Sequence, residues 1–261
     1  MRIVRFTPGP DSGLGQDPLF GVLEDDATIS IINGDPIYSG IQKTAAKIEL
    51  NKVRLLAPII PRSKVVCVGK NYADHAAEMG GVVPEEPIIF LKPNTSVIGP
   101  NDTIVWPDMS ERIDHEAELA IVIGRICKDV PLERVNDVIF GYTIANDVTA
   151  RDIQKKDGQW TRAKGFDTFC PIGPWVDTDF IPGTQKITAT IAGEVKQSAQ
   201  ISDMIFDVPT IVNFVSRVMT LLPGDIILTG TPAGIGPMVA GEKATMTIEG
   251  LGELTNKVSA K

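Results

Sequence analysis

The 261-residue sequence has few cysteines, few histidines and no long apolar run, and these shortages exclude several classes of protein. The three cysteines, Cys67, Cys127 and Cys170, are widely spaced and form no CxxC pair, so neither a disulfide framework nor a cysteine zinc site is expected. No stretch approaches the roughly 20 apolar residues of a membrane span, and the start has no long apolar segment typical of a signal peptide. We therefore expect a soluble, cytoplasmic protein.

Positive charge is also in short supply. Lysine and arginine total 25 against 33 aspartates and glutamates, which gives a formal net charge of −8. That sign is wrong for a surface that follows phosphate backbones, so nucleic acid is not an expected partner. The same field opposes the approach of a small anion. An anionic substrate would therefore need local cations, either lysine, arginine or a metal ion.

Short β-strand patterns are abundant, whereas helical periodicity is scarce. Turn residues around Pro58 divide the chain, and we predict a small β-rich domain over residues 1–58 and a larger domain over residues 59–261. A regular βαβ alternation is missing, which favours an irregular, β-dominated fold over a doubly wound sheet or a TIM barrel. Strands are expected at 2–6, 19–23, 28–32, 65–68, 88–91, 103–106, 118–123, 139–145, 187–191, 225–228 and 244–248, and helices at 72–79, 132–135, 149–155 and 208–219.

Two glutamates, Glu116 and Glu118, stand one residue apart at the start of an apolar run that is typical of a strand. Alternation places both carboxylates on one face, roughly 7 Å apart, where both can reach one cation. Asp147 ends another strand-like run. Three carboxylates favour a hard cation, Mg²⁺ or Mn²⁺, over Zn²⁺. From the spacing alone, a solvated strand face with a helix-capping Asp147 is an equal alternative.

Other polar residues have both a chemical and an ordinary interpretation. His75 and Glu78 lie at i and i+3 of a predicted helix, which suits a general base backed by a carboxylate but also a surface ion pair. Lys164 precedes a glycine in a loop rich in aromatic residues and proline, where it could stabilise an enolate or remain a solvated charge. Thr231 lies in a glycine-rich turn that lacks the GxGxxG spacing of a nucleotide site. The turn could hold a carboxylate, and an ordinary structural turn is an equal alternative.

Six segments together closely resemble the fumarylacetoacetate hydrolase superfamily. The resemblance implies a catalytic domain of mixed β-roll fold, in the α+β class but dominated by strands, with a divalent metal site and a homodimer. The first residues resemble the small N-terminal domain of the bacterial members. The six segments are GKNYADHAAE (69–78), PIIFLKP (87–93), DHEAELAIVIG (114–124), GYTIANDVTARDIQ (141–154), KGFDTFCPIGPW (164–175) and PGDIILTGTPAGIG (223–236).

The resemblance also implies roles for individual residues of these segments. Three match metal ligands, three match catalytic positions and three match substrate-binding positions of the superfamily. The metal ligands are Glu116, Glu118 and Asp147, the catalytic residues are His75, Glu78 and Lys164, and the substrate-binding residues are Arg151, Gln154 and Thr231.

The chemistry that the resemblance implies acts on 2-oxo acids, with Mg²⁺ or Mn²⁺ holding the C1 carboxylate and the C2 oxygen while an enolate develops beside Lys164. The expected reaction is oxaloacetate decarboxylation to pyruvate and CO₂, or acylpyruvate hydrolysis by water that His75 and Glu78 activate. One alternative is a 2-hydroxyhepta-2,4-diene-1,7-dioate isomerase or decarboxylase. A noncatalytic, metal-dependent binder of dicarboxylates is a third.

Overall fold

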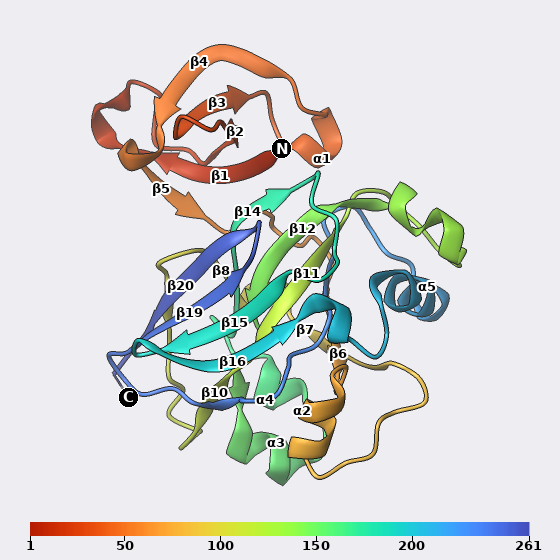
Figure 1. Cartoon of the computed structure of the whole chain (residues 1–261). Coiled ribbons are helices and arrows are strands. Elements are labelled where there is room, and N and C mark those ends of the chain that lie inside the picture. The colour runs from red at the N-terminus through yellow and green to blue at the C-terminus, as the bar shows by residue number, and fades with distance from the viewer. Residues whose placement is uncertain (261) are drawn as a thin grey trace.

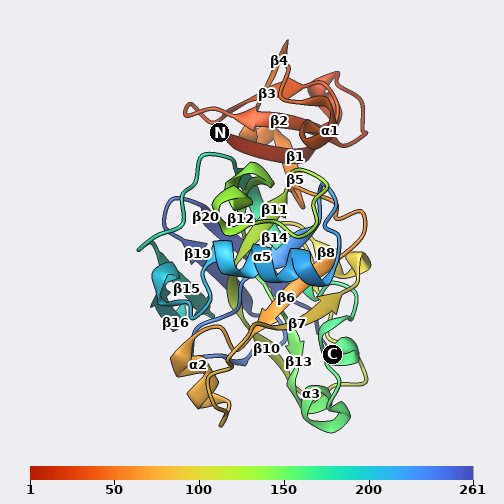
Figure 2. The same ribbon diagram turned by 90° about the vertical axis from the view of Figure 1, so that its right-hand side faces the viewer.

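The first strands form a separate layer at one end of the molecule in the computed structural model, which describes residues 1–260 (Figures 1 and 2). The antiparallel order is β4-β3-β2-β1, and β5 also pairs with β1. Arg2 of β1 pairs with Asp177 of β14, so this layer continues into the main sheet. The domain boundary at residue 58 stays a prediction. The elements are β1 (Arg2–Pro8), β2 (Leu19–Leu23), β3 (Thr28–Ile32), α1 (Pro36–Ser39), β4 (Lys43–Glu49) and β5 (Val53–Leu56).

The main sheet continues in the order β1-β14-β12-β11-β17-β6-β7 and is mixed, because β6 and β17 run parallel while the other neighbours in this order are antiparallel. All seven residues of β11 are buried. A strand that is covered on both faces reads as a continuous apolar run, which explains the sequence of β11. The strands are β6 (Val65–Gly69), β7 (Ile88–Lys92), β11 (Ala117–Ile123), β12 (Ile139–Asn146), β14 (Cys170–Asp177) and β17 (Ile226–Leu228), with β8 (Val97–Ile98) beside β14.

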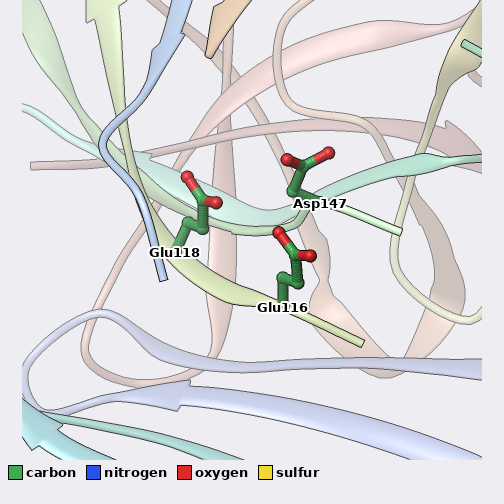
Figure 3. Close-up of side chains that lie close together, drawn as sticks. All are labelled: Glu116, Glu118 and Asp147. Carbon is green, nitrogen blue, oxygen red and sulfur yellow. The ribbon is translucent and has the colours of Figure 1, made fainter. Parts of the chain in front are cut away.

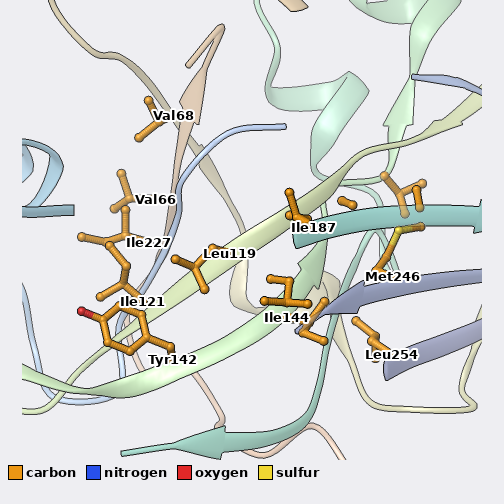
Figure 4. Close-up of a cluster of buried hydrophobic side chains, with 14 of the residues drawn as sticks. Val66, Val68, Leu119, Ile121, Tyr142, Ile144, Ile187, Ile227, Met246 and Leu254 are labelled. Carbon is orange, nitrogen blue, oxygen red and sulfur yellow. The ribbon is translucent and has the colours of Figure 1, made fainter. Parts of the chain in front are cut away.

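A second sheet packs against one face of the main sheet in the order β16-β15-β19-β20-β9. Burial alternates along β15 and β19, as expected for strands with one covered face. Figure 4 shows Leu119 and Ile144 of the main sheet beside Ile187 and Leu254 of the second sheet. The strands are β9 (Thr103–Ile104), β15 (Lys186–Ile191), β16 (Glu194–Gln200), β19 (Lys243–Ile248) and β20 (Gly252–Val258). The prediction of a β-dominated, mixed fold is confirmed.

Short helices and a small third sheet complete the fold. Figures 1 and 2 place α2 and α3 at the end of the molecule opposite the N-terminal layer. No helix among residues 1–260 has the length and apolarity that a membrane span requires. The helices are α2 (Ala73–Glu78), α3 (Arg151–Asp157), α4 (Thr161–Lys164) and α5 (Val208–Val218), and the small sheet contains β10 (Ile113–His115), β13 (Thr149–Ala150) and β18 (Gly236–Pro237).

Three local predictions differ from the structure in type or extent. The predicted helix at 132–135 is a 3₁₀ helix, Leu132–Asp137, in which only Val135 is buried, so no apolar stripe supports a longer α-helix. The helix predicted from residue 149 begins at Arg151, because Thr149–Ala150 pairs with β10. The proline-rich segment around residue 171 was expected to be a loop but forms β14, whose register with β12 is irregular and tolerates the prolines.

Candidate active site

Three carboxylates meet where β11 begins and β12 ends (Figure 3). Glu116 lies between β10 and β11, Glu118 is the second residue of β11, and Asp147 follows β12. The Asp147 amide donates a hydrogen bond to the Glu116 carbonyl at 2.9 Å, which keeps the two segments side by side. One oxygen from each carboxylate lies within 4.8 Å of the others. We call Glu116, Glu118 and Asp147 the acidic triad.

The acidic triad is buried, with exposures of 4%, 1% and 1% for Glu116, Glu118 and Asp147. The expectation that the two glutamates share a face is therefore confirmed, and the alternative of a solvated strand face is wrong. Asp147 does not cap α3, because the N-cap residue is Ala150 and no side chain caps the helix. A buried carboxylate without a compensating partner is costly. The partners of each carboxylate therefore decide what the triad can bind.

Lysines neutralise Asp147 and Glu116. The Lys164 ammonium bridges them, at 2.7 Å from Glu116 Oε2 and 2.6 Å from Asp147 Oδ2. The Lys92 ammonium lies 2.5 Å from Asp147 Oδ1. Burial alone would raise the pKa of the Glu116 carboxyl, but Lys164 and Arg151 hold that pKa below its usual value. Burial alone would lower the pKa of Lys164, but Asp147 and Glu116 raise it, so this lysine is cationic.

Lys164 does not lie in a loop, as the sequence suggested, but is the last residue of α4 and only 3% exposed. Lys92 was not predicted as a site residue at all. In the sequence Lys92 is only a lysine that ends an apolar run, a pattern that the exposed end of a strand also shows. Its burial beside Asp147 makes Lys92 part of the charge balance of the acidic triad.

Glu118 differs from the other two carboxylates because no cationic side chain in residues 1–260 forms an ion pair with it. The Gly230 amide donates a hydrogen bond to Glu118 Oε2 at 2.6 Å. Burial, followed by the charges of Asp147 and Glu116, raises the pKa of the Glu118 carboxyl well above its usual value. A divalent cation would relieve this repulsion, and an all-oxygen donor set suits Mg²⁺ or Mn²⁺. The acidic triad therefore fits such an ion.

The turn that supplies the Gly230 amide requires glycine at that position. Gly230 has φ +98°, and a Cβ there would lie 2.6 Å from the Asn71 Cβ atom. The next residue, Thr231, lines the site, and its Oγ1 accepts a hydrogen bond from Gln197 Nε2 at 2.7 Å. The Gln197 Nε2 atom also donates to the Pro232 carbonyl, so the hydroxyl of Thr231 is held in place.

His75 and Glu78 lie together on α2, as the i and i+3 spacing predicted. His75 Nδ1 is 3.1 Å from Glu78 Oε2, and Glu78 Oε1 accepts a hydrogen bond from the Gly234 amide at 3.2 Å. The pair is not a surface ion pair, because His75 is buried and lines the same cavity as the acidic triad. Glu78 lies at the protein surface and fixes the orientation of the imidazole.

Arg151 is engaged by protein groups on α3 and β10. Its Nε donates to Asp114 Oδ2 at 2.9 Å, its Nη1 donates to Gln154 Oε1 at 2.6 Å, and its Nη2 forms an ion pair with Glu116. Arg151 and Gln154 both line the cavity. Arg151 orients Glu116, while the Gln154 amide nitrogen donates to no protein acceptor in residues 1–260, so it remains available to a ligand.

The cavity that joins these residues is small, about 30 Å³. The aromatic rings of Phe90 and Trp160 also line the cavity and contact each other edge to face, with 5.1 Å between their ring centres. Neither residue was predicted as a site residue.

Asp152 anchors the start of α3 to the segment before β10. Ser110 Oγ donates to Asp152 Oδ1 at 2.6 Å, and the Glu111 amide donates to Oδ2 at 2.9 Å. Partial burial acts to raise the pKa of the Asp152 carboxyl, but these hydrogen bonds lower it below its usual value. The ionised form is thus favoured by folding, and α3 with Arg151 and Gln154 is held in place.

We expect Asp152→Asn to lower the free energy of unfolding by about 1 kcal/mol at neutral pH, because the hydrogen bonds from Ser110 and Glu111 lose their charged acceptor. Because the pKa of this carboxyl is lower in the folded than in the unfolded protein, ionised Asp152 stabilises the fold at pH values above the unfolded pKa, about 4. This contribution disappears as the pH falls through the pKa of the folded protein. Urea unfolding of both proteins at neutral pH and at several points below about pH 4 measures it. A difference that stays constant across this range would contradict the role of the carboxylate.

Comparisons with known proteins bear on both parts of the chain. The family model described as fumarylacetoacetate (FAA) hydrolase C-terminal matches residues 64–259, and the Rv2993c-like N-terminal model matches residues 1–58. The chain is 60% identical over 231 residues to Protein Rv2993c of Mycobacterium tuberculosis, covering 87% of this chain and 85% of that protein. It is 43% identical over 219 residues to mitochondrial oxaloacetate tautomerase Fahd2a of Rattus norvegicus, covering 80% and 70%.

Solved structures show the same fold. The 2-hydroxyhepta-2,4-diene-1,7-dioate isomerase from Mycobacterium marinum aligns with a TM-score of 0.90 and 49% identity, over 100% of this chain and 99% of that chain. A fumarylpyruvate hydrolase from Pseudomonas aeruginosa, in complex with Mn²⁺ and pyruvate, aligns with a TM-score of 0.73 and 33% identity, over 80% and 92%. The chain therefore belongs to the fumarylacetoacetate hydrolase superfamily, and its close relatives are enzymes of that family.

Proposed function

We propose that this protein is a divalent-metal-dependent enzyme that interconverts the enol and keto forms of a dicarboxylic 2-oxo acid, with oxaloacetate as the first candidate. The observation that carries this proposal is one cavity whose lining combines the buried acidic triad, the buried His75 imidazole and the buried Lys164 ammonium. Tautomerisation requires a base and a site that stabilises negative charge, and the cavity contains both. The names of the rat and Arabidopsis thaliana relatives, both oxaloacetate tautomerases, support this choice.

The acidic triad would hold Mg²⁺ or Mn²⁺. A bound divalent cation supplies a Lewis acid that polarises the carbonyl group of a 2-oxo acid. Glu118 has no cationic partner among residues 1–260, which supports this ligand set. The Mn²⁺ in the fumarylpyruvate hydrolase complex supports it as well.

His75 and Lys164 then have complementary tasks. Since Nδ1 faces Glu78, we assign the imidazole proton to Nδ1 and the lone pair to Nε2. Nε2 removes a proton from C3 of the keto acid, and the C3–H electron pair becomes the C2=C3 bond. Negative charge develops on the C2 oxygen, where the cationic Lys164 stabilises it, and the His75 imidazolium returns the proton to that oxygen to complete the enol. Glu78 stabilises the imidazolium.

Carbon–carbon bond cleavage is the second candidate, because it develops the same charge on the same oxygen. In oxaloacetate decarboxylation the C3–C4 bond breaks, CO₂ leaves, and the electron pair again forms C2=C3. This step needs no base. In acylpyruvate hydrolysis His75 instead takes a proton from the water that attacks C4. The fumarylpyruvate hydrolase relative supports hydrolysis, and the isomerase relative supports proton transfer at the dienedioates.

The deciding experiment supplies oxaloacetate as its enol to the Mn²⁺-loaded protein. Loss of the enol is followed by ultraviolet absorbance, and pyruvate is measured by a coupled assay. A blank with Mn²⁺ alone is needed because free metals polarise 2-oxo acids. We expect the enol to disappear faster than in the blank, without matching pyruvate release. Equal rates of enol loss and pyruvate release would instead favour decarboxylation, and no acceleration of either would reject both oxaloacetate tautomerisation and oxaloacetate decarboxylation.

The role of His75 predicts a split between substrates. We expect His75→Ala to lower tautomerisation and acylpyruvate hydrolysis by about 100-fold or more, since a general base contributes that much. Oxaloacetate decarboxylation, which needs no base, should fall by less than about tenfold. Turnover of oxaloacetate and acetylpyruvate by both proteins measures the split, with calorimetry to show that Mn²⁺ affinity is unchanged. Equal losses in all three reactions would count against a separate role for His75.

A further inference from the structure

Lys70 differs from the other cations that line the cavity. Arg151 and Lys164 are each bound to carboxylates of the protein. Lys70 also lines the cavity, directly after the last residue of β6, but its ammonium group forms no ion pair or side-chain hydrogen bond among the described residues 1–260. Its charge is therefore free to bind an anion that enters.

The backbone at Lys70 is held in a conformation that long side chains rarely adopt. Its φ is +56°, in the left-handed region. Asn71 fixes one side of it, since its Nδ2 donates to the Thr229 carbonyl at 2.7 Å and its Oδ1 accepts from the Phe206 amide at 2.8 Å. Gly69 fixes the other side against Trp160, where a Cβ would lie 2.8 Å from the indole ring. Such strain persists only where the surroundings impose it, and it is common at ligand-binding positions.

The Lys70 ammonium lies close to another segment that lines the cavity. A Cβ on Gly81 would lie 2.7 Å from Lys70 Nζ, so the ammonium lies beside the segment that follows α2. His75 and Met79 line the cavity from the same part of the chain. The acidic triad already has Lys92, Lys164 and Arg151 as partners. Lys70 is thus a cationic side chain of the cavity lining that the acidic triad does not engage.

We propose that Lys70 binds the distal carboxylate of a dicarboxylic 2-oxo acid and so selects dicarboxylates over monocarboxylates. This inference rests on the proposed function, since it assumes that the 2-oxo acid end lies at the acidic triad. The net charge of −8 repels a dianion, and a second carboxylate needs a cation of its own. A charge-assisted hydrogen bond from an unpaired ammonium meets that need.

The test measures ligand affinity rather than turnover. Calorimetry with the Mn²⁺-loaded protein compares (S)-malate with (S)-2-hydroxybutanoate, which has the same carbon chain but a methyl group in place of the distal carboxylate. We expect Lys70→Met to bind malate about tenfold more weakly and 2-hydroxybutanoate within about twofold of wild type. Lys70→Arg should retain most of the preference for malate. Lys156→Met, on the exposed face of α3, is the matched control for the loss of one positive charge.

Each outcome decides the proposal. Equal losses of affinity for both ligands in Lys70→Met, or no loss for either, would overturn it. The same loss of malate affinity in Lys156→Met, or a wild-type protein that binds neither ligand, would also overturn it. Lys70→Gly removes the ammonium and relieves the strained backbone, so it should show the same selective loss with undiminished thermal stability. Failure of the oxaloacetate assay together with a selective malate loss would reject the proposed reaction while retaining the dicarboxylate contact.

Discussion

Glu118→Gln should abolish metal binding and turnover while leaving the metal-free protein at least as stable as the wild type. The Glu118 carboxylate is buried beside Asp147 and Glu116, has no cationic partner in residues 1–260, and accepts one hydrogen bond from Gly230. Glutamine keeps that hydrogen bond and removes the repulsion. Losing one charged ligand of three should weaken Mn²⁺ affinity by at least about 100-fold, more than the loss of a supporting residue. The native Glu118 therefore lowers the stability of the metal-free protein and in return provides a metal ligand.

Asp147→Asn provides the contrast, since Asp147 is bound to Lys92 and Lys164. Removing this charge leaves two buried ammonium groups less compensated, which should cost about 3 kcal/mol or more, in addition to the loss of the metal. Asp74→Asn, at an exposed position of α2, is the matched control and should change neither property. Thermal unfolding with and without Mn²⁺, together with calorimetry, measures both quantities. Unchanged Mn²⁺ affinity in Glu118→Gln would remove Glu118 from the ligand set.

The strand pattern and the acidic triad could be predicted because both depend on local alternation. Period-two spacing sets the face on which Glu116 and Glu118 lie, and an apolar run such as β11 has few other conformations available. Asp147 was a candidate third ligand because it ends a strand-like run, and the family resemblance decided between that role and a helix cap. Spacing could not decide, since the pairing of β11 with β12 joins residues about 30 positions apart. Single-sequence spacing contains no information about that pairing.

The charge balance of the site could not be predicted for the same reason. Lys92 reaches Asp147 across 55 positions of sequence, and nothing local distinguishes it from a lysine at the exposed end of a strand. Lys164 was placed in a loop because the glycine and proline residues after it resemble turn signals. The structure shows a short helix and then β14 instead, since tertiary packing against β12 and β1 outweighs local preference.

Substitution of Lys164 can distinguish metal binding from catalysis, because the lysine contacts two of the candidate metal ligands but is not itself one of them. Its ammonium occupies the space between Glu116 Oε2 and Asp147 Oδ2, so it competes with any cation for those oxygens. It is also a buried cation of the cavity lining, and its ammonium lies 5.1 Å from the centre of the Phe90 ring. Burial away from water strengthens its interaction with a developing oxyanion.

We therefore expect Lys164→Met to lower kcat by about 100- to 1,000-fold, the loss found when one oxyanion donor is removed. Its Mn²⁺ affinity should equal or exceed that of the wild type, because the competing cation is gone. Calorimetry and steady-state kinetics on the same preparation measure the two effects, with Lys156→Met as the control. Turnover and affinity lost together would mean that Lys164 only holds the acidic triad in shape. Affinity retained without turnover would separate it from Glu118, whose replacement removes both, and would assign the developing negative charge to the Lys164 ammonium.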